Sequence, residues 1–362
     1  MPIICDAYKF PPVGNAPGGG TIAIIELGGG WVHFDMKKFF NQNGMPIPDL
    51  TDISVDGVTN NTHQSPTDDA DFEVALDIQI AGTAYFHATG KKANIHIYWG
   101  QDIAQCIRRA AADGCSVCSI SWGADEAEWG HAALADLEAA AGEATAAGMV
   151  IFAAAGDNDS SDGGATPANV DAPGSCPHVI SCGGTRKTVD TETVWNNNPG
   201  QTDGSGTGGG YSSAFPVQSW QVGAPPAPSR LPGDKDPGTG RMVPDLAANA
   251  DPDTGYDIVV YAQWAVVGGT SAVAPLYAGL FAALSAKGLG FISPKLWDVA
   301  NRGCFTDITQ GNNGDYDAVV GPDPCTGLGA PVGVKLMELF TQVNQAESES
   351  AQAPPPSHYW GS

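Results

Sequence analysis

The sequence predicts an α/β fold in which a central, mostly parallel sheet is flanked by helices. Apolar strand-like runs alternate with helix-like runs along most of the chain, which is the pattern of successive βαβ units. The strand-like runs are apolar throughout, as strands covered on both faces are. With 362 residues, 42% of them apolar, the chain can build one large core. We expect one domain over residues 3–344 and a disordered tail over residues 345–362.

Each element is predicted from its own pattern. Short apolar runs predict strands at residues 21–27, 93–99, 115–122, 149–155 and 179–182. Longer runs predict helices at residues 71–87, 101–112 and 132–147. A β-type run at residues 258–267 precedes a buried helix that contains the apolar residues 276–284. Residues 196–255 are rich in Gly, Pro, Asn and Asp and are expected to form long surface loops.

The chain is strongly acidic. Its 40 Asp and Glu residues against 16 Lys and Arg residues give a formal net charge of −24 at pH 7. Nucleic acid is excluded as a partner, because binding to phosphates needs clustered basic side chains. Two explanations of the acidity stay open. One is a solvated surface that keeps the protein soluble, and the other is a protein built for acid, where protonation relieves the self-repulsion.

Neither a membrane span nor a leader is expected. The chain has no run of about 18 apolar residues. Its first six residues, MPIICD, lack the basic and apolar regions of a signal peptide. The chain therefore starts either as a cytosolic product or as a trimmed mature domain.

The eight cysteines are too few for a disulfide scaffold in a chain of this length. Cys115 and Cys118 form a C-x-x-C pair within a predicted strand and are expected to be buried thiols. Cys304 and Cys325 flank an acidic loop and are the best candidates for a disulfide bond.

Residues 268–275, GGTSAVAP, predict a serine nucleophile at Ser271. Small residues let a substrate backbone approach closely, and the N-terminus of the following helix favours developing negative charge. A serine hydroxyl is a weak nucleophile until a base takes its proton. The G-T-S-x-x-x-P pattern is similar to that of subtilisin-like serine peptidases, which use histidine as this base. None of the seven histidines has the His-Gly-Thr-His setting of those enzymes, and we expect each to be structural or solvated.

Two carboxylates are better candidates for the base. Glu73 and Asp77 are four residues apart in a predicted apolar helix, so they share one helix face. Their repulsion is relieved if they share a proton, which raises one pKa. The pattern predicts a relay in which Glu73 takes the proton of Ser271 and Asp77 orients Glu73. An acidic first helix turn is the alternative for Asp71 and Glu73, although it does not explain Asp77 in the second turn.

Asp157 follows the predicted strand at residues 149–155. Ligand chemistry in open α/β sheets gathers at the carboxyl ends of strands. A protonated Asp157 can donate a hydrogen bond to an oxyanion, either in acid or with a raised pKa. An ordinary loop aspartate is the alternative.

Together these residues resemble the sedolisin family of serine-carboxyl peptidases, and more closely its kumamolisin-like members. The resemblance rests on seven segments in family order: IIELGGG from Ile24, Glu73 with Asp77, SISWG from Ser119, AAAGD from Ala153, VPDL from Val243, residues 268–275, and DPCTGLG from Asp323. It implies a subtilisin-like fold and an acid-active endopeptidase that works through an acyl-enzyme. Ser271 is then the nucleophile, Glu73 the base, Asp77 its orienter and Asp157 the oxyanion donor.

The resemblance also implies an outer network in which Glu26 and Trp122 extend the chain of hydrogen-bonded carboxyl groups. Glu26 lies in an apolar strand, where an unpaired charge is costly. Burial with a backbone partner is the alternative for this residue. Acid operation is consistent with a carboxylate base, because near pH 4 a histidine is almost wholly protonated. A glutamate with an ordinary pKa of about 4.3 is still partly available.

One structural calcium ion is a further implication of the resemblance. Asp307 and Asp323 are its expected side-chain ligands, and Ile308, Val319 and Gly321 its expected carbonyl ligands. Oxygen atoms of these kinds suit a hard cation. Departures from the family pattern occur at Val319, where Gly is common, and at residue 322, where Pro replaces Trp. An acidic, glycine-containing turn without metal is the alternative.

Substrate contacts are expected at three further residues. Ser121 and Gly123 are expected to offer an extended edge that pairs with a peptide backbone, with an ordinary strand end as the alternative. Asp171 is expected to line a subsite for basic side chains. We expect a monomer that acts on protein or peptide substrates and, by the resemblance, is secreted.

Two features depart from the family pattern. Sedolisins are typically made with a long N-terminal propeptide, and no such segment is recognised in this sequence, so we expect it to be either the mature part or a chain that folds unaided. Asn158 and Asp159 replace the small Ser-Gly pair that often follows the oxyanion aspartate. Two other functions stay open: an inactive, calcium-stabilised binding protein, and a histidine-based subtilisin active near neutral pH.

Overall fold

The main sheet of the protein is parallel, as the sequence predicts. The computed structural model describes residues 2–62, 69–224, 226, 230 and 238–341. The order of strands is β12-β8-β6-β4-β1-β3-β2, and every neighbouring pair on this path is parallel. The strands are β1 (Thr21–Glu26), β2 (Asp49–Ser54), β3 (Asn94–Trp99), β4 (Val117–Ile120), β6 (Val150–Ala154), β8 (Ile180–Lys187) and β12 (Leu246–Asn249). A short strand, β9 (Glu192–Val194), pairs antiparallel with β8.

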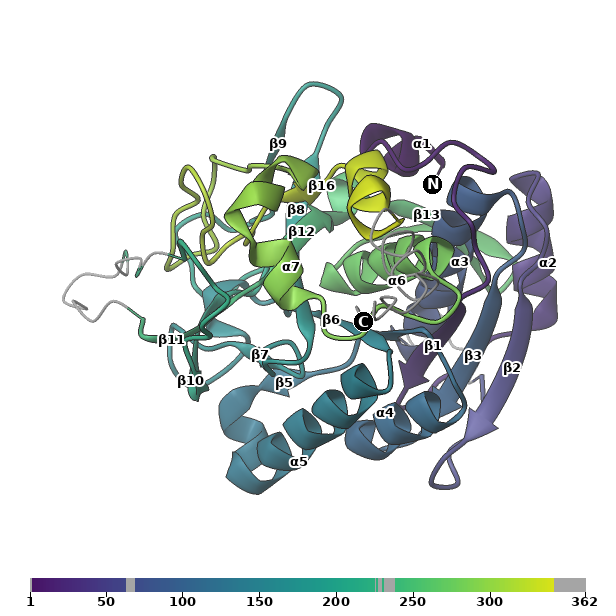
Figure 1. Ribbon diagram of the computed structural model, residues 1–362, viewed down its shortest axis with the longest axis horizontal. Coiled ribbons are helices and arrows are strands. Elements are labelled where there is room, and N and C mark those ends of the chain that lie inside the picture. Colours follow the sequence, from purple (N-terminus) through teal and green to yellow (C-terminus); the bar gives the residue numbers. More distant parts are fainter. Residues whose placement is uncertain (1, 63–68, 225, 227–229, 231–237, 342–362) are drawn as a thin grey trace, which may run out of the picture.

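Helices cover both faces of this sheet (Figure 1). On one face, α4 (Ile103–Ala112) and α5 (Glu126–Ala146) pack on apolar residues of the central strands. On the other face, α3 (Asp69–Thr89) and α6 (Val273–Leu284) form the larger core, together with α2 (His33–Gln42). Every residue of α6 is buried, which explains its unbroken apolar sequence. The predicted fold class is therefore confirmed.

Helix α5 shows how the sequence sets an element boundary. The side chain of Asp125 accepts the N–H of Ala127 and caps the helix. Gly130 then interrupts the helix with a φ of +73°, a value that glycine adopts readily. The helix predicted over residues 132–147 corresponds to the part after this kink.

The prediction of long loops over residues 196–255 is wrong in three places. The segment contains β10 (Gly210–Pro216), β11 (Gly240–Val243) and the edge strand β12. Strand β12 pairs with β8 from Leu246 opposite Cys182 and is completely buried. Four residues are too few to show the alternating pattern of a strand, so the sequence carried no sign of β12. A buried ion pair between Arg241 and Asp245, 2.6 Å long, holds the chain in place just before this strand.

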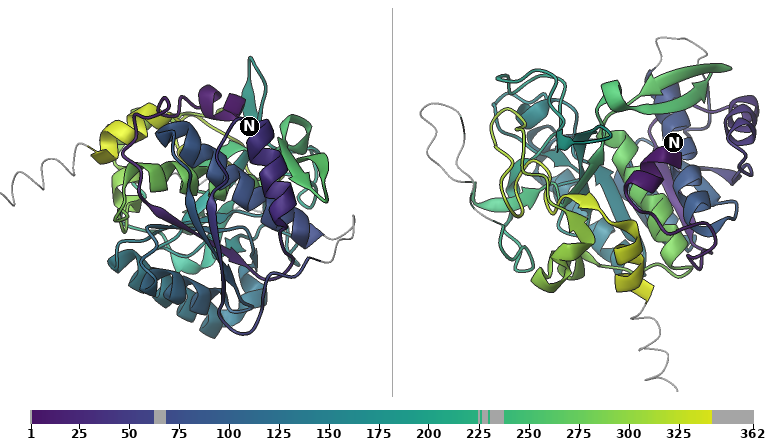
Figure 2. Two further views of the ribbon diagram at one scale, coloured as in Figure 1. Left: turned by 90° about the vertical axis from the view of Figure 1, so that its right-hand side faces the viewer. Right: turned by 90° about the horizontal axis from the view of Figure 1, so that it is seen from above.

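The β-type run before Ser271 is a hairpin, where one strand was expected. Strands β13 (Tyr256–Val260) and β14 (Gln263–Val267) pair antiparallel outside the main sheet. The turn residues Tyr261 and Ala262 both have positive φ, as a two-residue hairpin turn of this kind requires. The views in Figure 2 place this green hairpin at the edge of the molecule.

The remaining elements are short or lie at the edges. Helix α2 and strand β2 were not predicted. Strand β2 is a half-exposed edge strand of mixed polarity, so it has no apolar run that would indicate a strand. The short elements are α1 (Pro2–Ala7), α7 (Ser293–Trp297), β5 (Ala124–Asp125), β7 (Asp171–Ala172), β15 (Phe305–Thr306) and β16 (Ala330–Pro331). None of the described helices is long and apolar enough to cross a membrane. The predicted tail, residues 345–362, lies outside the described residues.

The predicted disulfide between Cys304 and Cys325 is wrong, because all eight cysteines are free thiols. The Cys325 thiol is completely buried and donates to the carbonyl oxygen of Tyr316 at 3.2 Å. Cys304 packs into the core at the end of a short 3₁₀ segment, Val299–Cys304. The two thiols therefore have separate surroundings on either side of the acidic loop. Cys115 and Cys118 are buried, as predicted.

Candidate active site

The predicted site residues meet at the carboxyl edge of the main sheet. Glu26 ends β1, Ser121 follows the last residue of β4, and Asp157 follows β6. These three strands are adjacent in the order β6-β4-β1. Parallel strands deliver the residues after their C-termini to one edge, which is where open α/β sheets carry their sites. Helix α3 and the short 3₁₀ segment Thr270–Ala272 bring the remaining residues to the same edge.

Ser271 lies on that 3₁₀ segment, directly before α6, and is 8% exposed. Its hydroxyl lies 3.5 Å from the carbonyl oxygen of Ser121. The preceding Gly269 has a φ of +99°, and a Cβ there would lie 2.5 Å from Oδ2 of Asp157. Glycine is therefore required at this turn for both conformation and space. The turn brings the serine hydroxyl and the Asp157 carboxyl group to the same place.

Glu73 faces Ser271 from the second turn of α3. Burial raises the pKa of Glu73 to about 7, and the charge of Asp157 contributes to this rise. The hydroxyl groups of Ser271 and Ser121 partly offset it. Oε1 of Glu73 is buried and has no hydrogen-bond partner among the described residues. This carboxyl group is placed to accept the serine proton.

Asp77 lies one helical turn behind Glu73 and is completely buried. The Oγ atom of Ser121 lies 2.9 and 3.0 Å from its two carboxyl oxygens, so the hydroxyl donates to this group. Burial raises the pKa of Asp77 well above its ordinary range, and the charges of Glu73 and Glu26 add to the rise. Burial thus favours the neutral form of Asp77.

Glu26 occupies the third position of this carboxyl group cluster. It is completely buried, and the indole Nε1 of Trp122 donates to its Oε2 at 2.8 Å. Burial raises the pKa of Glu26 well above its ordinary range, with a further contribution from Glu73. The structure thus brings Glu26 and Trp122 beside the residues of the predicted relay.

Asp157 approaches Ser271 from the opposite side. Its Oδ1 accepts hydrogen bonds from the N–H and the hydroxyl of Thr270, at 2.7 and 2.8 Å. Burial raises the pKa of Asp157 above its ordinary value, and the hydrogen bonds from Thr270 oppose the rise. Because Oδ1 accepts two donors, a proton on this group belongs on Oδ2, which lies over Gly269. That oxygen is then a donor directed at the site.

A cavity of about 200 Å³ adjoins Ser271. Ser121, Gly123 and Asp171, the three predicted substrate contacts, line it together with Asp157 and Asp162. A Cβ at Gly123 would lie 2.1 Å from Oδ1 of Asp171, so a side chain there would displace the carboxyl group. A separate cavity of about 320 Å³, between α2 and the β13–β14 hairpin, contains none of the predicted site residues.

Sequence reasoning missed Asp162. Its pKa is raised to about 8 by burial, with Asp125 and Asp157 adding to the rise. The pKa of Asp171 is raised well above its ordinary range, again by burial first and by Asp162 second. Asp162 lies in a Ser-Asp-Gly turn, a pattern typical of ordinary loops, so its sequence carried no signal.

The described histidines lie away from this cavity. His63 and His358 fall outside the described residues, and the other five do not line the cavity beside Ser271. His178, for example, pairs with Glu138 on α5 at 2.6 Å. No described histidine is therefore placed to act as base for Ser271.

Comparisons with known proteins agree with this arrangement. The family model described as the subtilase family matches residues 19–295. Kumamolisin from Bacillus sp. (strain MN-32) is 41% identical over 365 residues, covering 95% of this chain and 64% of the relative. The chain belongs to the subtilase family, among its kumamolisin-like sedolisins.

Sedolisin from Pseudomonas sp. (strain 101) is 28% identical over 361 residues, covering 91% of this chain and 58% of that protein. The structure of Pseudomonas sedolisin, a serine-carboxyl proteinase complexed with pseudo-iodotyrostatin, has a TM-score of 0.78 at 26% identity. That likeness covers 92% of this chain and 97% of the sedolisin chain. Tripeptidyl-peptidase SED1 of Arthroderma otae is 31% identical over 208 residues, covering 48% of this chain and 30% of that protein. This sedolisin-family chain thus spans less than two thirds of each curated relative.

The loop predicted to hold calcium brings its two carboxylates to one short segment. The N–H of Gly321 donates to Oδ2 of Asp307 at 2.8 Å, and the N–H of Val319 donates to Oδ2 of Asp323 at 3.1 Å. Asp323 is completely buried, and burial raises its pKa to about 6. Asp307 is exposed, and the side chain of Ile308 is buried. Among the described residues, no three His, Cys, Asp or Glu side chains converge, so carbonyl ligands are needed to complete a metal site here.

We expect this protein to be most stable in acid. The pKa of Glu73 is about 7 and that of Asp162 about 8, against about 4 for such groups in an unfolded chain. Between these values the folded state binds more protons than the unfolded state. The free energy of unfolding therefore falls as the pH rises from about 4 to 8, by up to about 1.4 kcal/mol per proton and pH unit.

Chemical denaturation of the Ser271→Ala variant between pH 3.5 and 8.5 measures this slope. Glu73→Gln and Asp162→Asn, each added to Ser271→Ala, should flatten it. A stability that rises with pH over this range would contradict the expected proton uptake.

Proposed function

We propose that the chain is an acid-active serine-carboxyl endopeptidase, which hydrolyses peptide bonds through Ser271, Glu73 and Asp77. The observation that carries the proposal is the position of Ser271 between Glu73 and Asp157, two carboxyl groups with raised pKa values. No described histidine lines the same cavity. The likeness to a serine-carboxyl proteinase supports the assignment. Its substrates are then proteins or peptides.

In the first half of the reaction, Oγ of Ser271 attacks the carbonyl carbon of the scissile bond. Its proton passes to Glu73, and the carbonyl oxygen gains negative charge. The protonated Oδ2 of Asp157 donates a hydrogen bond to this oxygen, in the role of an oxyanion hole. Glu73 then donates the proton to the leaving amine, and the acyl group stays on Ser271.

In the second half, water attacks the acyl-enzyme and Glu73 accepts a proton from it. Collapse of the tetrahedral intermediate returns this proton to Ser271 and releases the acid product. Asp77, fixed by the hydroxyl of Ser121, holds Glu73 in position throughout. Glu26, which accepts a hydrogen bond from Trp122, interacts with the Glu73 carboxyl group as well. Burial favours the neutral forms of Asp77 and Glu26, and the proposed reaction needs Glu73 to be the ionised member.

The pH dependence follows from two requirements, an ionised Glu73 and a protonated Asp157. The fraction of enzyme with Glu73 ionised and Asp157 protonated is greatest at the pH midway between their two pKa values. This holds whichever of the two groups has the higher pKa. The pKa of Glu73 is about 7 and that of Asp157 lies above its ordinary value of 3.8. The bell-shaped profile of kcat/KM is thus expected to peak on the acid side of neutrality.

Cleavage of a denatured protein between pH 2 and 8 tests this function. Ser271→Ala and Glu73→Gln should each lower kcat/KM by roughly 10⁴-fold or more, because nucleophile and base act as a unit. Asp157→Ala should cost about 10²- to 10³-fold. Asp157→Asn keeps a neutral donor that cannot ionise, so the alkaline limb should move to higher pH. Activity that peaks above pH 7, or that survives Ser271→Ala, would exclude the proposal.

Internal cleavage is separated from release of tripeptides by the products. Peptides with an acetylated N-terminus should be cut at internal bonds, as read by mass spectrometry. Release of successive tripeptides, with no cleavage of the acetylated forms, would instead assign the activity named for the Arthroderma otae relative.

The acidic cavity supports a preference for a basic substrate side chain. Asp171 and Asp162 line it, so a Lys or Arg side chain would donate to two carboxyl groups, and its positive charge would favour their ionised forms. Asp171→Asn should lower kcat/KM for peptides with Arg at the cleaved bond by roughly tenfold or more, since a buried charged hydrogen bond is worth about 1.5–3 kcal/mol. Peptides with Leu there, which form no such bond, are the matched control. An equal loss for both would reject the assignment.

We also propose one structural calcium ion in the loop of Asp307 and Asp323. The buried Asp323 carboxyl group supports the fit, with Asp307 beside the same backbone segment. Ile308, Val319 and Gly321 would contribute carbonyl oxygens, and the ion would supply charge neutralisation and loop rigidity. Secretion and a monomeric state stay predictions from the resemblance.

Removal of calcium should lower the melting temperature. Because burial raises the pKa of Asp323 to about 6, a proton competes with the ion, and binding should weaken below that pH. Thermal unfolding of Ser271→Ala at pH 6.5, with added Ca²⁺ or with EDTA, measures the effect. Asp323→Asn should abolish it, whereas Asp317→Asn, on an exposed side chain paired with Arg230, should not. A melting temperature insensitive to EDTA would exclude the ion.

A further inference from the structure

The segment after Asp157 contains a carboxyl group that the proposed reaction does not use. The side chain of Asp159 is completely buried, and neither of its oxygens has a well-formed hydrogen bond among the described residues. Its φ is +52°, in the left-handed region, which Asp and Asn adopt more readily than most residues other than glycine. Burial of a carboxyl group without well-formed hydrogen bonds is costly. This cost, at a residue beside the site, indicates a role for the group.

Two glycines form a cradle around this carboxyl group. A Cβ at Gly206 would lie 1.9 Å from Oδ1 of Asp159, and a Cβ at Gly204 would lie 2.5 Å from Oδ2. Any side chain at either position would collide with the carboxyl group. The segment that contains Gly204 and Gly206 is therefore packed directly on Asp159.

The same segment holds the backbone of Asp157. The N–H of Gly206 donates to the carbonyl oxygen of Asp157 at 3.1 Å, and the N–H of Asp159 donates to the carbonyl oxygen of Gly206 at 3.0 Å. Gly208 adds a bond from its N–H to the carbonyl oxygen of Gly156 at 2.8 Å. A displacement of Gly206 therefore shifts the backbone that positions the Asp157 carboxyl group.

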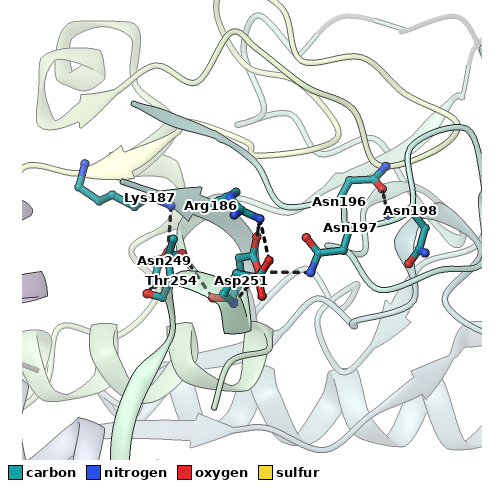
Figure 3. A network of polar contacts seen from close by, with 9 residues as sticks. Arg186, Lys187, Asn196, Asn197, Asn198, Asn249, Asp251 and Thr254 are labelled. Atoms are coloured by element: carbon teal, nitrogen blue, oxygen red, sulfur yellow. Dashed lines mark hydrogen bonds and ion pairs between the residues drawn. The ribbon is translucent and has the colours of Figure 1, made fainter. Parts of the chain in front are cut away.

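The chain just before the cradle is held by polar contacts of Asn197 and Asn198 (Figure 3). Asn197 donates to Oδ1 of Asp251 at 3.2 Å, and Arg186 pairs with the other oxygen of Asp251 at 2.8 Å. The side-chain oxygen of Asn198 accepts the N–H of Ser205 at 2.8 Å. These contacts hold the chain on one side of the cradle in place. A charge on Asp159 would therefore act on the other side, where Gly204 and Gly206 contact its carboxyl group.

The charged groups on the surrounding segments are acidic. Asp203 precedes the cradle, and its charge acts on Asp159. The other acidic residues on the adjoining segments are Asp157, Asp162, Asp315 and Asp317. Arg230, the cation on this side, pairs with Asp317 at 3.3 Å. No described Lys, Arg or His forms an ion pair with Asp159.

These surroundings favour a proton as the partner of the group. Burial, with the charge of Asp203 adding to it, raises the pKa of Asp159 to about 7, although the N–H of Gly204 partly offsets the rise.

We propose that Asp159 is a positioning residue whose neutral carboxyl group keeps the glycine cradle closed on the Asp157 segment, and whose ionisation opens it. The inference rests on the proposed role of Asp157 for its effect on catalysis. A closed segment binds more protons than an open one between pH 4 and 7. Closure is therefore most favourable below about pH 4 and is lost as the pH rises through about 7. The site would disassemble locally and reversibly near neutral pH.

Amide hydrogen exchange in the Ser271→Ala protein tests the closure without any need for activity. Protection of residues 157–163 and 203–208, corrected for intrinsic exchange, should fall by about tenfold or more between pH 5 and 7.5. Asp159→Asn has the same shape, tolerates the left-handed φ and cannot ionise, so its protection should fall markedly less than that of the parent, with only the contributions of groups such as Asp162 left. Asp190→Asn, in the exposed turn between β8 and β9, should behave like the parent. An equal fall with and without Asp159→Asn would overturn the proposal.

Asp159→Gly provides a second variant, which also removes the carboxyl group and relaxes the backbone. It too should show a markedly smaller fall in protection than the parent, and a fall equal to that of the parent would count against the proposal. Protection that follows added Ca²⁺ instead of pH, and is lost in Asp159→Asn, would replace the proton by a metal ion and overturn it.

Enzyme with Ser271 intact separates this inference from the proposed function. After incubation at pH 7.5, a jump back to acid should show a lag in peptide cleavage while the segment closes. The lag should be absent in Asp159→Asn. A parent inactive at every pH defeats the proposed function and leaves the exchange result standing. An active parent with no lag and no pH-dependent exchange defeats the inference alone.

Discussion

Three carboxyl groups, those of Glu26, Glu73 and Asp77, lie close together in the interior without a cationic partner among the described residues. Burial removes the solvation of their charges, and each charge repels the others. The cluster must therefore hold protons in the folded state. These protons neutralise the carboxyl groups, as a cationic partner does at an ordinary buried acid. The hydroxyl of Ser121 and the indole of Trp122 each donate to one member. Glu73 is the member that faces Ser271.

The lack of cationic partners also limits which groups can stabilise negative charge on the side of Ser271 opposite Glu73. A serine proton taken by Glu73 leaves negative charge to be stabilised elsewhere, and no described Lys, Arg or His lines the cavity. A neutral carboxyl group at Asp157 can supply the donor, provided that it too is kept protonated. Thr270 fixes one oxygen of Asp157, and Gly269 lets the other come close to the nucleophile. The proposed chemistry thus depends on carboxyl groups in two protonation states, set by burial and local hydrogen bonds.

Close approach of backbone segments is the second condition for this site. Gly123, Gly206 and Gly269 each lie where a Cβ would strike a carboxyl oxygen. Acidic groups line the substrate cavity and the segment behind it, at Asp171, Asp162 and Asp159. This second cluster explains part of the acidic composition in physical terms. Some of these carboxyl groups are buried with raised pKa values, so they are not solvated surface charges.

How much could be predicted differs between strands and site. The apolar runs at residues 21–27, 115–122 and 149–155 predicted the central strands, because a strand covered on both faces must be apolar. Strand β12 was missed, since four residues carry no period and its register comes from pairing with β8. The disulfide between Cys304 and Cys325 was wrongly predicted from their positions on either side of an acidic loop. Only the fold shows that the two thiols are free and have separate surroundings.

By itself, the sequence determined the fold class and predicted Ser271, Glu73, Asp77 and Asp157 as candidate site residues, because helix spacing and strand ends place such side chains by local rules. Only the tertiary structure decided their protonation. The pKa of a carboxyl group depends on burial and on charges that lie far away in the chain, as Asp162 and Asp159 demonstrate. Neither residue has a sequence pattern that distinguishes it from an ordinary loop aspartate, yet each lies buried in the closed fold.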